Sequence, residues 1–221
     1  MKGLAGLSLF AATLLALASP AGAQGTPRSG KAASPSATNP YAQRFATLCA
    51  ACHGANGRSD MPGTPALAGQ HSFYAITQLF LFRERRRTNE AMTAVAKQMS
   101  DADMQGFASF IGTLPPVPAP PPATPPDPAR MKKGAELAQQ HKCLACHGAD
   151  FAGGQQVPRI GGQREDYLQM TLREFKSGQR PGYTMAMGSA LSLVTPEELD
   201  TLAYYAARFP DAVGGGSAPQ R

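Results

Sequence analysis

All four cysteines of this chain stand in two pentapeptides of one pattern, Cys-x-x-Cys-His. They read Cys49-Ala50-Ala51-Cys52-His53 and Cys143-Leu144-Ala145-Cys146-His147. Two thiols three positions apart lie on one helical turn, where both can form thioethers with the vinyl groups of a haem, and the next residue presents its imidazole to the iron. The pattern therefore predicts two covalently bound haem c groups. The expected attachment residues are Cys49, Cys52, Cys143 and Cys146, and the expected axial ligands are His53 and His147.

Other uses of paired cysteines fit the chain less well. A zinc site built from two Cys-x-x-Cys knuckles would join pairs that lie 94 positions apart (143 − 49) in separate halves of the chain. A thioredoxin-like dithiol needs a strand that leads into a helix, and no such pattern surrounds either motif. Trp is absent and aromatic residues make up 7% of the chain. A haem would thus supply apolar volume that a small core otherwise lacks.

The N-terminus has the pattern of a bacterial signal peptide. Lys2 gives a short positive region, an apolar run follows, and Ala21-Gly22-Ala23 offers a cleavage site with small residues. The run is too short to span a membrane comfortably. We therefore expect residues 1–23 to be removed and the protein to be exported to the periplasm, where c-type haem is attached. An uncleaved anchor is the alternative.

The remaining sequence repeats one unit. The Cys motifs are offset by 94 positions, and the matches that follow are offset by 93 (167 − 74) or 95 (187 − 92). They pair residues 65–70 with 158–163, Tyr74 with Tyr167, Phe82 with Phe175, Arg87 with Arg180, Met92 with Met187, Ser100 with Thr195 and Phe110 with Tyr205. The offset between matching residues stays between 93 and 95 along the whole unit, which indicates tandem duplication of a small domain.

Composition places the boundaries of these units. Residues 24–39 are rich in Ser, Pro, Gly and Ala and are expected to be disordered. Residues 115–128 contain nine prolines and are expected to form a semi-rigid polyproline linker. The predicted organisation is a signal peptide (1–23), a disordered segment (24–39), domain 1 (40–114), the linker (115–128), domain 2 (129–210) and a flexible tail (211–221).

Each unit is predicted to be helical. A first helix (about 40–49 and 129–141) leads into the Cys motif, a middle helix follows (about 71–87 and 164–177), and a Met-bearing loop leads to a last helix. Ser100 and Thr195 are N-cap residues followed by acidic residues in the first turn. No alternation of β-branched residues is sustained, so the fold class is all-α.

The sixth iron ligand separates an electron carrier from a catalyst, because an open position can bind oxygen or peroxide. Met92 and Met187 occupy equivalent repeat positions, each eight residues before a last-helix cap, whereas His71 and His141 are not equivalent. A thioether ligand favours ferrous haem and raises the reduction potential. Met92 and Met187 are therefore the expected ligands. The rivals are Met99 in the first unit, Met185 in the second, and His71 as a bis-His ligand.

Two further features lie near these ligands. Pro65 and Pro158 follow the motifs, and a backbone carbonyl there can accept a hydrogen bond from the second nitrogen of the axial histidine. A plain loop proline is the alternative. Arg83, Arg85, Arg86 and Arg87 cluster late in the middle helix. We interpret them as a solvated helix end, with docking to an acidic redox partner as the second reading.

Together these motifs resemble the cytochrome c4 family of periplasmic dihaem proteins. The resemblance spans about residues 40–209 and rests on Cys-Ala-Ala-Cys-His-Gly, Pro-Ala-Leu-Ala-Gly-Gln-His, Arg-Arg-Thr-Asn-Glu-Ala-Met and Met-Ser-Asp-Ala-Asp, with their counterparts in the second half. It implies two tandem class I cytochrome c domains joined by the proline-rich linker. It also implies the axial pairs His53/Met92 and His147/Met187.

The resemblance implies an electron-transfer protein rather than an enzyme, passing electrons to a terminal oxidase or another respiratory acceptor. The alternative is a dihaem subunit of a periplasmic dehydrogenase complex, of the sulfide-oxidising flavocytochrome or alcohol dehydrogenase type. A dihaem peroxidase would need an open iron. The expected partners are periplasmic or membrane-bound oxidases or dehydrogenases, with a monomeric protein that is soluble or peripherally membrane-associated. The net charge of +6 is spread over a mixed surface, and no nucleic-acid motif accompanies it.

Overall fold

The structure is a computed structural model that describes residues 39–117, 120, 124–180 and 185–209. The expected signal peptide, all but the last residue of the segment 24–39 and the tail 211–221 lie outside the described residues. Parts of the linker 115–128 also lie outside them. Within the described part, no helix is long and apolar enough to cross a membrane.

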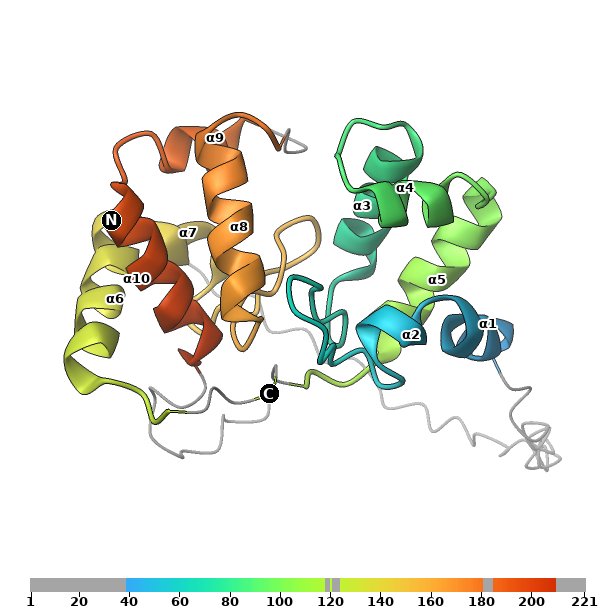
Figure 1. The fold of residues 1–221 in the computed structure, drawn as a ribbon, viewed down its shortest axis with the longest axis horizontal. Coiled ribbons are helices and arrows are strands. Elements are labelled where there is room, and N and C mark those ends of the chain that lie inside the picture. Colours follow the sequence, from blue (N-terminus) through green and yellow to red (C-terminus); the bar gives the residue numbers. More distant parts are fainter. Residues whose placement is uncertain (1–38, 118–119, 121–123, 181–184, 210–221) are drawn as a thin grey trace, which may run out of the picture. The chain divides into compact units, whose positions relative to one another are not determined.

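The two repeats have the same order of helices (Figure 1). The first repeat contains α1 (Pro40–Leu48), α2 (Ala50–His53), α3 (Ser72–Arg83), α4 (Glu90–Ala96) and α5 (Asp101–Thr113). The second contains α6 (Pro128–Gln140), α7 (Cys143–His147), α8 (Glu165–Lys176), α9 (Ala186–Ala190) and α10 (Pro196–Ala207). Apart from an isolated bridge between Gly154 and Val157, the described residues form no β-structure. The predicted all-α fold class is confirmed.

The helices begin where the sequence offers a cap. Both last helices start with a reciprocal capping box, in which the N-cap hydroxyl of Ser100 or Thr195 and the carboxylate three residues later each accept a backbone N–H. Asp127 caps α6, and Pro128 takes its first position, where a missing N–H costs nothing. Pro128, the last residue of the expected linker 115–128, is thus the first residue of α6.

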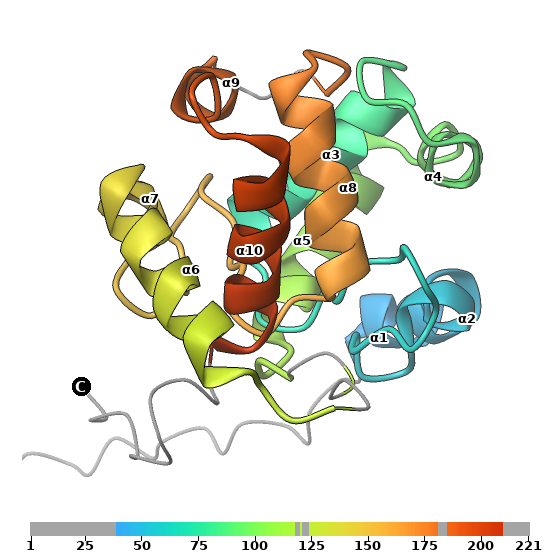
Figure 2. The ribbon, with the colours of Figure 1, turned by 60° about the vertical axis from the view of Figure 1, so that its left-hand side comes forward.

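Each repeat builds its own core around its last helix. In the first repeat α5 packs against α3 and α1, and in the second α10 packs against α6 and α8, as Figure 2 shows for α6, α8 and α10. The largest buried side chains of these cores are Phe45 and Phe107 in one and Phe151, Leu137 and Leu199 in the other. A glycine allows the first and last helices of each repeat to approach closely. Gly106 faces the Tyr41 ring, and Gly134 faces Tyr205.

Two expectations about the middle of each repeat were wrong. The predicted Met-bearing loops contain short helices, because Met92 lies in α4 and Met187 in α9. The predicted helix 71–87 ends at Arg83, and the chain turns at Arg85, whose φ is 55°. The N–H groups of Arg86 and Arg87 then donate to Leu81 O, so the chain folds back beside α3 instead of continuing it.

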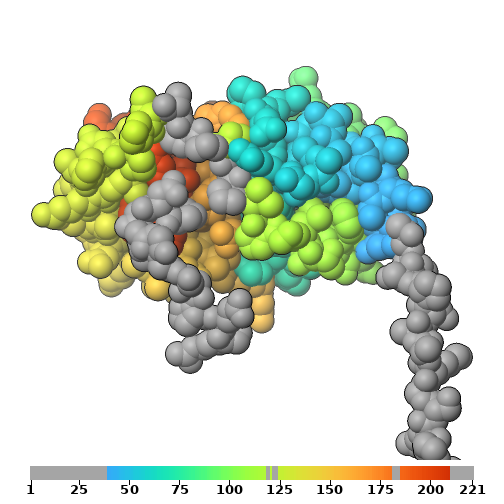
Figure 3. Space-filling model, turned by 90° about the horizontal axis from the view of Figure 1, so that it is seen from below, coloured from blue at the N-terminus to red at the C-terminus, as the bar shows by residue number. Residues whose placement is uncertain are grey.

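The repeats also contact each other through hydrogen bonds. His71 Nε2 lies 2.8 Å from Ala152 O, and Gly63 N donates to Asp166 Oδ2 at 2.9 Å. The chain that leaves α5 lies on the first repeat, where Gly69 N donates to Leu114 O at 2.9 Å. Figure 3 views the face on which the end of α5 and the start of α6, both in yellow-green, are exposed.

Candidate functional site: two Cys-x-x-Cys-His turns

Each Cys motif forms a single helical turn that ends on its histidine. In α2, the N–H groups of Cys52 and His53 donate to Cys49 O at 3.2 and 2.9 Å. This turn places both cysteine side chains on one side and leaves one half-buried and the other exposed. Cys143 and Cys146 in α7 show the same difference in burial. The inner cysteine of each motif packs against the core of its own repeat.

The chain reverses directly after each histidine. Gly54 and Gly148 have φ values of 76° and 79°, a left-handed conformation that favours glycine. Ser59 N then donates to His53 O at 2.9 Å, and Gly153 N donates to His147 O at 2.8 Å. These bonds close a loop over the end of the turn and hold the histidine backbone in place.

Both histidine rings are buried and fixed through one nitrogen. His53 Nδ1 lies 2.9 Å from Pro65 O, and His147 Nδ1 lies 3.1 Å from Pro158 O. Since a carbonyl oxygen accepts, Nδ1 carries the proton and Nε2 is left as the nitrogen with a free lone pair. Burial lowers the pKa of His53 and of His147, partly opposed by these hydrogen bonds. Both rings are therefore held in the neutral form that ligates iron.

The candidate methionines occupy matching places in the two repeats, each on the short helix that precedes the last helix. Met92 lies in the first turn of α4, is half-buried and packs against the core of the first repeat. Met187 lies in the first turn of α9, is half-buried and packs against the core of the second. A thioether in this setting is in contact with apolar side chains but retains accessible surface.

The rival ligands lie in different surroundings. Met185 is 83% exposed. Met99 is a buried member of the first core and is 6% exposed. His71 Nε2 is engaged by Ala152 O of the second repeat. Met92 and Met187 occupy equivalent positions in the two repeats, and their role as iron ligands stays a prediction.

A cluster of two buried arginines, a buried tyrosine and a half-buried tyrosine was not anticipated. Arg87 is 9% exposed and Arg180 is 5% exposed, so the interpretation of Arg87 as part of a solvated helix end was wrong. Arg87 donates to Gln78 Oε1 at 2.8 Å and to Tyr167 Oη at 2.9 Å. Arg180 donates to Tyr167 Oη and to Tyr74 Oη, each at 3.3 Å. The equivalence of Arg87 with Arg180, and of Tyr74 with Tyr167, was the signal available in the sequence.

The donor set fits haem c. Each repeat offers two thiols on one turn, an inner one beside the core and an outer one at the surface, followed by a buried neutral imidazole whose free nitrogen is Nε2. A half-buried thioether lies on a separate short helix of each repeat. Soft sulfur and imidazole nitrogen are the ligands that low-spin haem iron takes in cytochromes c.

Comparison with known proteins gives the same assignment. The Cytochrome c family model matches residues 42–115 and again 131–207. The chain is 31% identical over 188 residues to cytochrome c4 of Thiocapsa roseopersicina, covering 79% of this chain and 95% of the relative. It is 31% identical over 175 residues to a thiosulfate dehydrogenase electron acceptor of Thiomonas intermedia, covering 75% of this chain and 80% of the relative.

Solved structures agree. Reduced recombinant cytochrome c4 from Pseudomonas stutzeri superposes with a TM-score of 0.68 at 26% identity, covering 76% of this chain and 95% of that one. The fold and the two Cys motifs define a dihaem c-type cytochrome, an electron-transfer protein that carries two haem c groups. Within that class, the chain belongs to the cytochrome c4 family.

Proposed function

We propose that each repeat holds its iron between a histidine and a methionine, His53 with Met92 and His147 with Met187. The observation that carries this proposal is the repeated arrangement of one buried imidazole, bonded through Nδ1 to a proline carbonyl, and one half-buried thioether on the following short helix. Cys49, Cys52, Cys143 and Cys146 form the thioether bonds, and Pro65 and Pro158 orient the imidazoles.

These side chains suit reversible one-electron transfer. When bound, haem supplies the ferric/ferrous couple. Methionine opposite histidine stabilises the reduced state, and two protein ligands leave no position for oxygen or peroxide. The apolar core of each repeat packs against the methionine and the inner cysteine of that repeat. The chain therefore acts as a carrier and not as an enzyme.

The partners that we propose follow from the relatives. Two similar proteins, from Thiomonas intermedia and from Stutzerimonas stutzeri, are named thiosulfate dehydrogenase electron acceptors. We infer that this cytochrome works in the periplasm, takes electrons from a dehydrogenase and passes them to a terminal oxidase or another respiratory acceptor. The exported location rests on the N-terminal pattern of residues 1–23.

A second candidate is a permanent cytochrome subunit of a dehydrogenase. The observation that favours it is a TM-score of 0.65, at 28% identity, to thiosulfate dehydrogenase from Marichromatium purpuratum, of which this chain covers 40%. Purification of the protein from the native cell distinguishes a free carrier from a dehydrogenase subunit. A free carrier elutes at the size of one chain, whereas a subunit elutes together with its dehydrogenase.

The ligand assignment is tested by replacing each methionine. Met92→Ala and Met187→Ala should each remove half of the weak absorbance near the red end of the ferric spectrum that reports iron–sulfur ligation. Met185→Ala is the matched control because that side chain is 83% exposed, and its spectrum should be unchanged. An unchanged spectrum in Met92→Ala or Met187→Ala removes that residue from the ligand set.

A further inference from the structure

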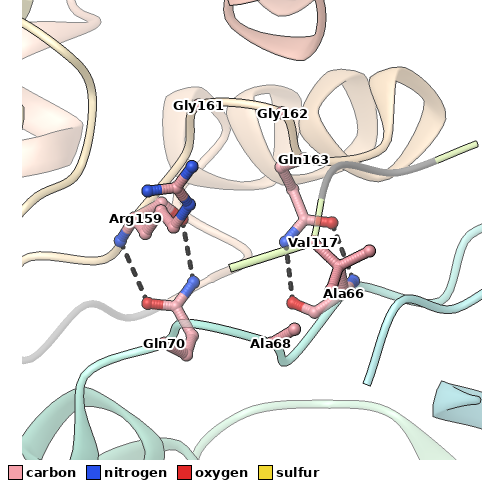
Figure 4. A pocket seen from close by; sticks show the side chains of 8 residues that line it. All are labelled: Ala66, Ala68, Gln70, Val117, Arg159, Gly161, Gly162 and Gln163. Carbon is pink, nitrogen blue, oxygen red and sulfur yellow. Dashed lines mark hydrogen bonds between the residues drawn. The ribbon is translucent and has the colours of Figure 1, made fainter. Parts of the chain in front are cut away.

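Two glutamines at equivalent repeat positions each bind the backbone of the opposite repeat (Figure 4). Gln163 Nε2 donates to Ala66 O at 2.9 Å, and Gln163 Oε1 accepts from Ala66 N at 2.8 Å. Gln70 Nε2 donates to Arg159 O at 2.8 Å, and Gln70 Oε1 accepts from Arg159 N at 3.0 Å. Both glutamines are buried, Gln70 at 7% exposure and Gln163 at 6%. The two pairs therefore exchange four hydrogen bonds between the repeats, away from solvent.

The backbone N–H groups that these glutamines bind belong to the peptide groups that orient the histidines. Ala66 N is joined to the Pro65 carbonyl carbon in one peptide plane, and Pro65 O accepts from His53 Nδ1. Arg159 N is joined in the same way to the Pro158 carbonyl, which accepts from His147 Nδ1. Each glutamine thus continues a hydrogen-bond chain that runs through one peptide group to the histidine of the other repeat.

Such a chain affects the histidine in two ways. It fixes the peptide plane, and with it the direction in which the carbonyl oxygen meets Nδ1. It also polarises the peptide, because accepting from the N–H makes the carbonyl a better acceptor in a low-dielectric interior. A stronger bond from Nδ1–H to a carbonyl raises the basicity of the imidazole as a metal ligand.

We propose that Gln163 is a positioning residue for His53 and that Gln70 is a positioning residue for His147, so that each repeat sets the ligand strength of the other repeat's histidine. This inference rests on the proposed axial role of the two histidines. It predicts a crossed response, in which a change in one repeat alters the haem of the other repeat.

The test uses the full holoprotein with Gln163→Met and Gln70→Met, which keep the side-chain length and remove the amide. We would measure the two reduction potentials by spectroelectrochemical titration and the ring-proton signals of both axial histidines by NMR. Met92→Ala and Met187→Ala identify which haem belongs to which repeat. If a methionine variant does not fold, Gln163→Asn or Gln70→Asn is measured in its place. The asparagine side chain is one methylene shorter, so its amide no longer reaches the backbone of the other repeat.

A weaker bond at Nδ1 makes the imidazole a poorer donor to ferric iron, so the potential rises. Gln163→Met should raise the potential of the first-repeat haem, speed solvent exchange of the His53 Nδ1 proton and leave the second-repeat haem unchanged. Gln70→Met should raise the potential of the second-repeat haem, speed solvent exchange of the His147 Nδ1 proton and leave the first-repeat haem unchanged. Equal changes at both haems, or a change confined to the repeat that carries the substitution, would overturn the inference.

His71→Leu is the matched control, since it removes a different hydrogen bond between the repeats, to Ala152 O. A crossed response of equal size in this variant would show that any loosening between the repeats suffices, and would overturn the positioning role. A wild-type spectrum without shifted imidazole signals from His53 and His147 would instead refute the axial assignment and this inference with it. Shifted signals in the wild type that respond to neither glutamine variant would refute this inference alone.

Discussion

Arg87 of the first repeat donates a hydrogen bond to the hydroxyl of Tyr167 in the second, with 2.9 Å between Nη2 and Oη. Arg180 approaches the same hydroxyl at 3.3 Å, and all three side chains are buried. Two guanidinium groups therefore share one phenolic oxygen. The carboxylate of Glu174 also lies near this cluster, with Oε2 3.7 Å from Arg180 Nη1.

Removing this hydroxyl should destabilise the protein. Tyr167→Phe leaves two buried arginines without one of their acceptors, and a hydrogen bond to a charged group contributes about 1.5–3 kcal/mol. We expect a loss of this size in the free energy of unfolding, measured with denaturant on the holoprotein. Tyr205→Phe is the control because its hydroxyl has no hydrogen-bond partner among the described residues, so an equal loss there would contradict the account.

The same cluster should change the ionisation of Tyr167. Burial raises its pKa, but the two guanidinium groups and their hydrogen bonds outweigh burial and lower the pKa of Tyr167 below the ordinary tyrosine value. The pKa of Tyr74 is raised, chiefly by burial and by the neighbouring Tyr167. Isotope-labelled tyrosine followed by NMR should show one phenol that ionises at lower pH than the rest. That signal should be absent in Tyr167→Phe.

The lowered pKa of Tyr167 determines how the free energy of unfolding changes with pH. The folded pKa of Tyr167 lies below its unfolded value, so this group adds to the free energy of unfolding as the pH rises above the folded pKa. The contribution is lost as the pH falls through the folded pKa. The difference in stability between wild type and Tyr167→Phe should therefore grow in mildly alkaline solution. A difference that shrinks there would contradict the shift.

Gly134 is required by the close crossing of α6 and α10. A Cβ built on Gly134 would lie 2.4 Å from Tyr205 Cβ, and overpacking of this kind costs about 1–3 kcal/mol. Gly134→Ala should lower the free energy of unfolding by this amount. Gly154→Ala is the control, because a Cβ there meets no atom within 4 Å. Equal stability of the two variants would show that the helices separate without cost.

The capping box of α10 should contribute measurably. Thr195 Oγ1 accepts from Glu198 N at 3.3 Å, and Thr195→Ala removes this cap at a cost of about 1 kcal/mol. Thr201→Ala, inside the same helix, is the control and should cause no loss, because its hydroxyl binds Glu197 O within a turn that forms without it. Thermal unfolding of both variants distinguishes a cap effect from a general loss of threonine.

The features of this molecule that could be predicted from sequence are mainly those encoded by local patterns of residues. The Cys motifs and the caps at Ser100 and Thr195 are short-range signals, and together with the repeat they predicted the helices and the two haems. Arg87 was misread because α3 ends at Arg83 and the chain turns back at Arg85, which no helical period reveals. The roles of Gln70 and Gln163 depend on contacts with residues 89 and 97 positions away. Only the meeting of the two repeats brings those residues together.

The proposed function requires both irons to carry two protein ligands and to exchange one electron each. A reductive titration of the fully oxidised protein, monitored by optical and electron paramagnetic resonance spectroscopy, tests it most directly. We predict uptake of two electrons per chain and low-spin signals from both ferric irons. A high-spin iron that reacts rapidly with peroxide would contradict the account and identify a catalytic haem instead.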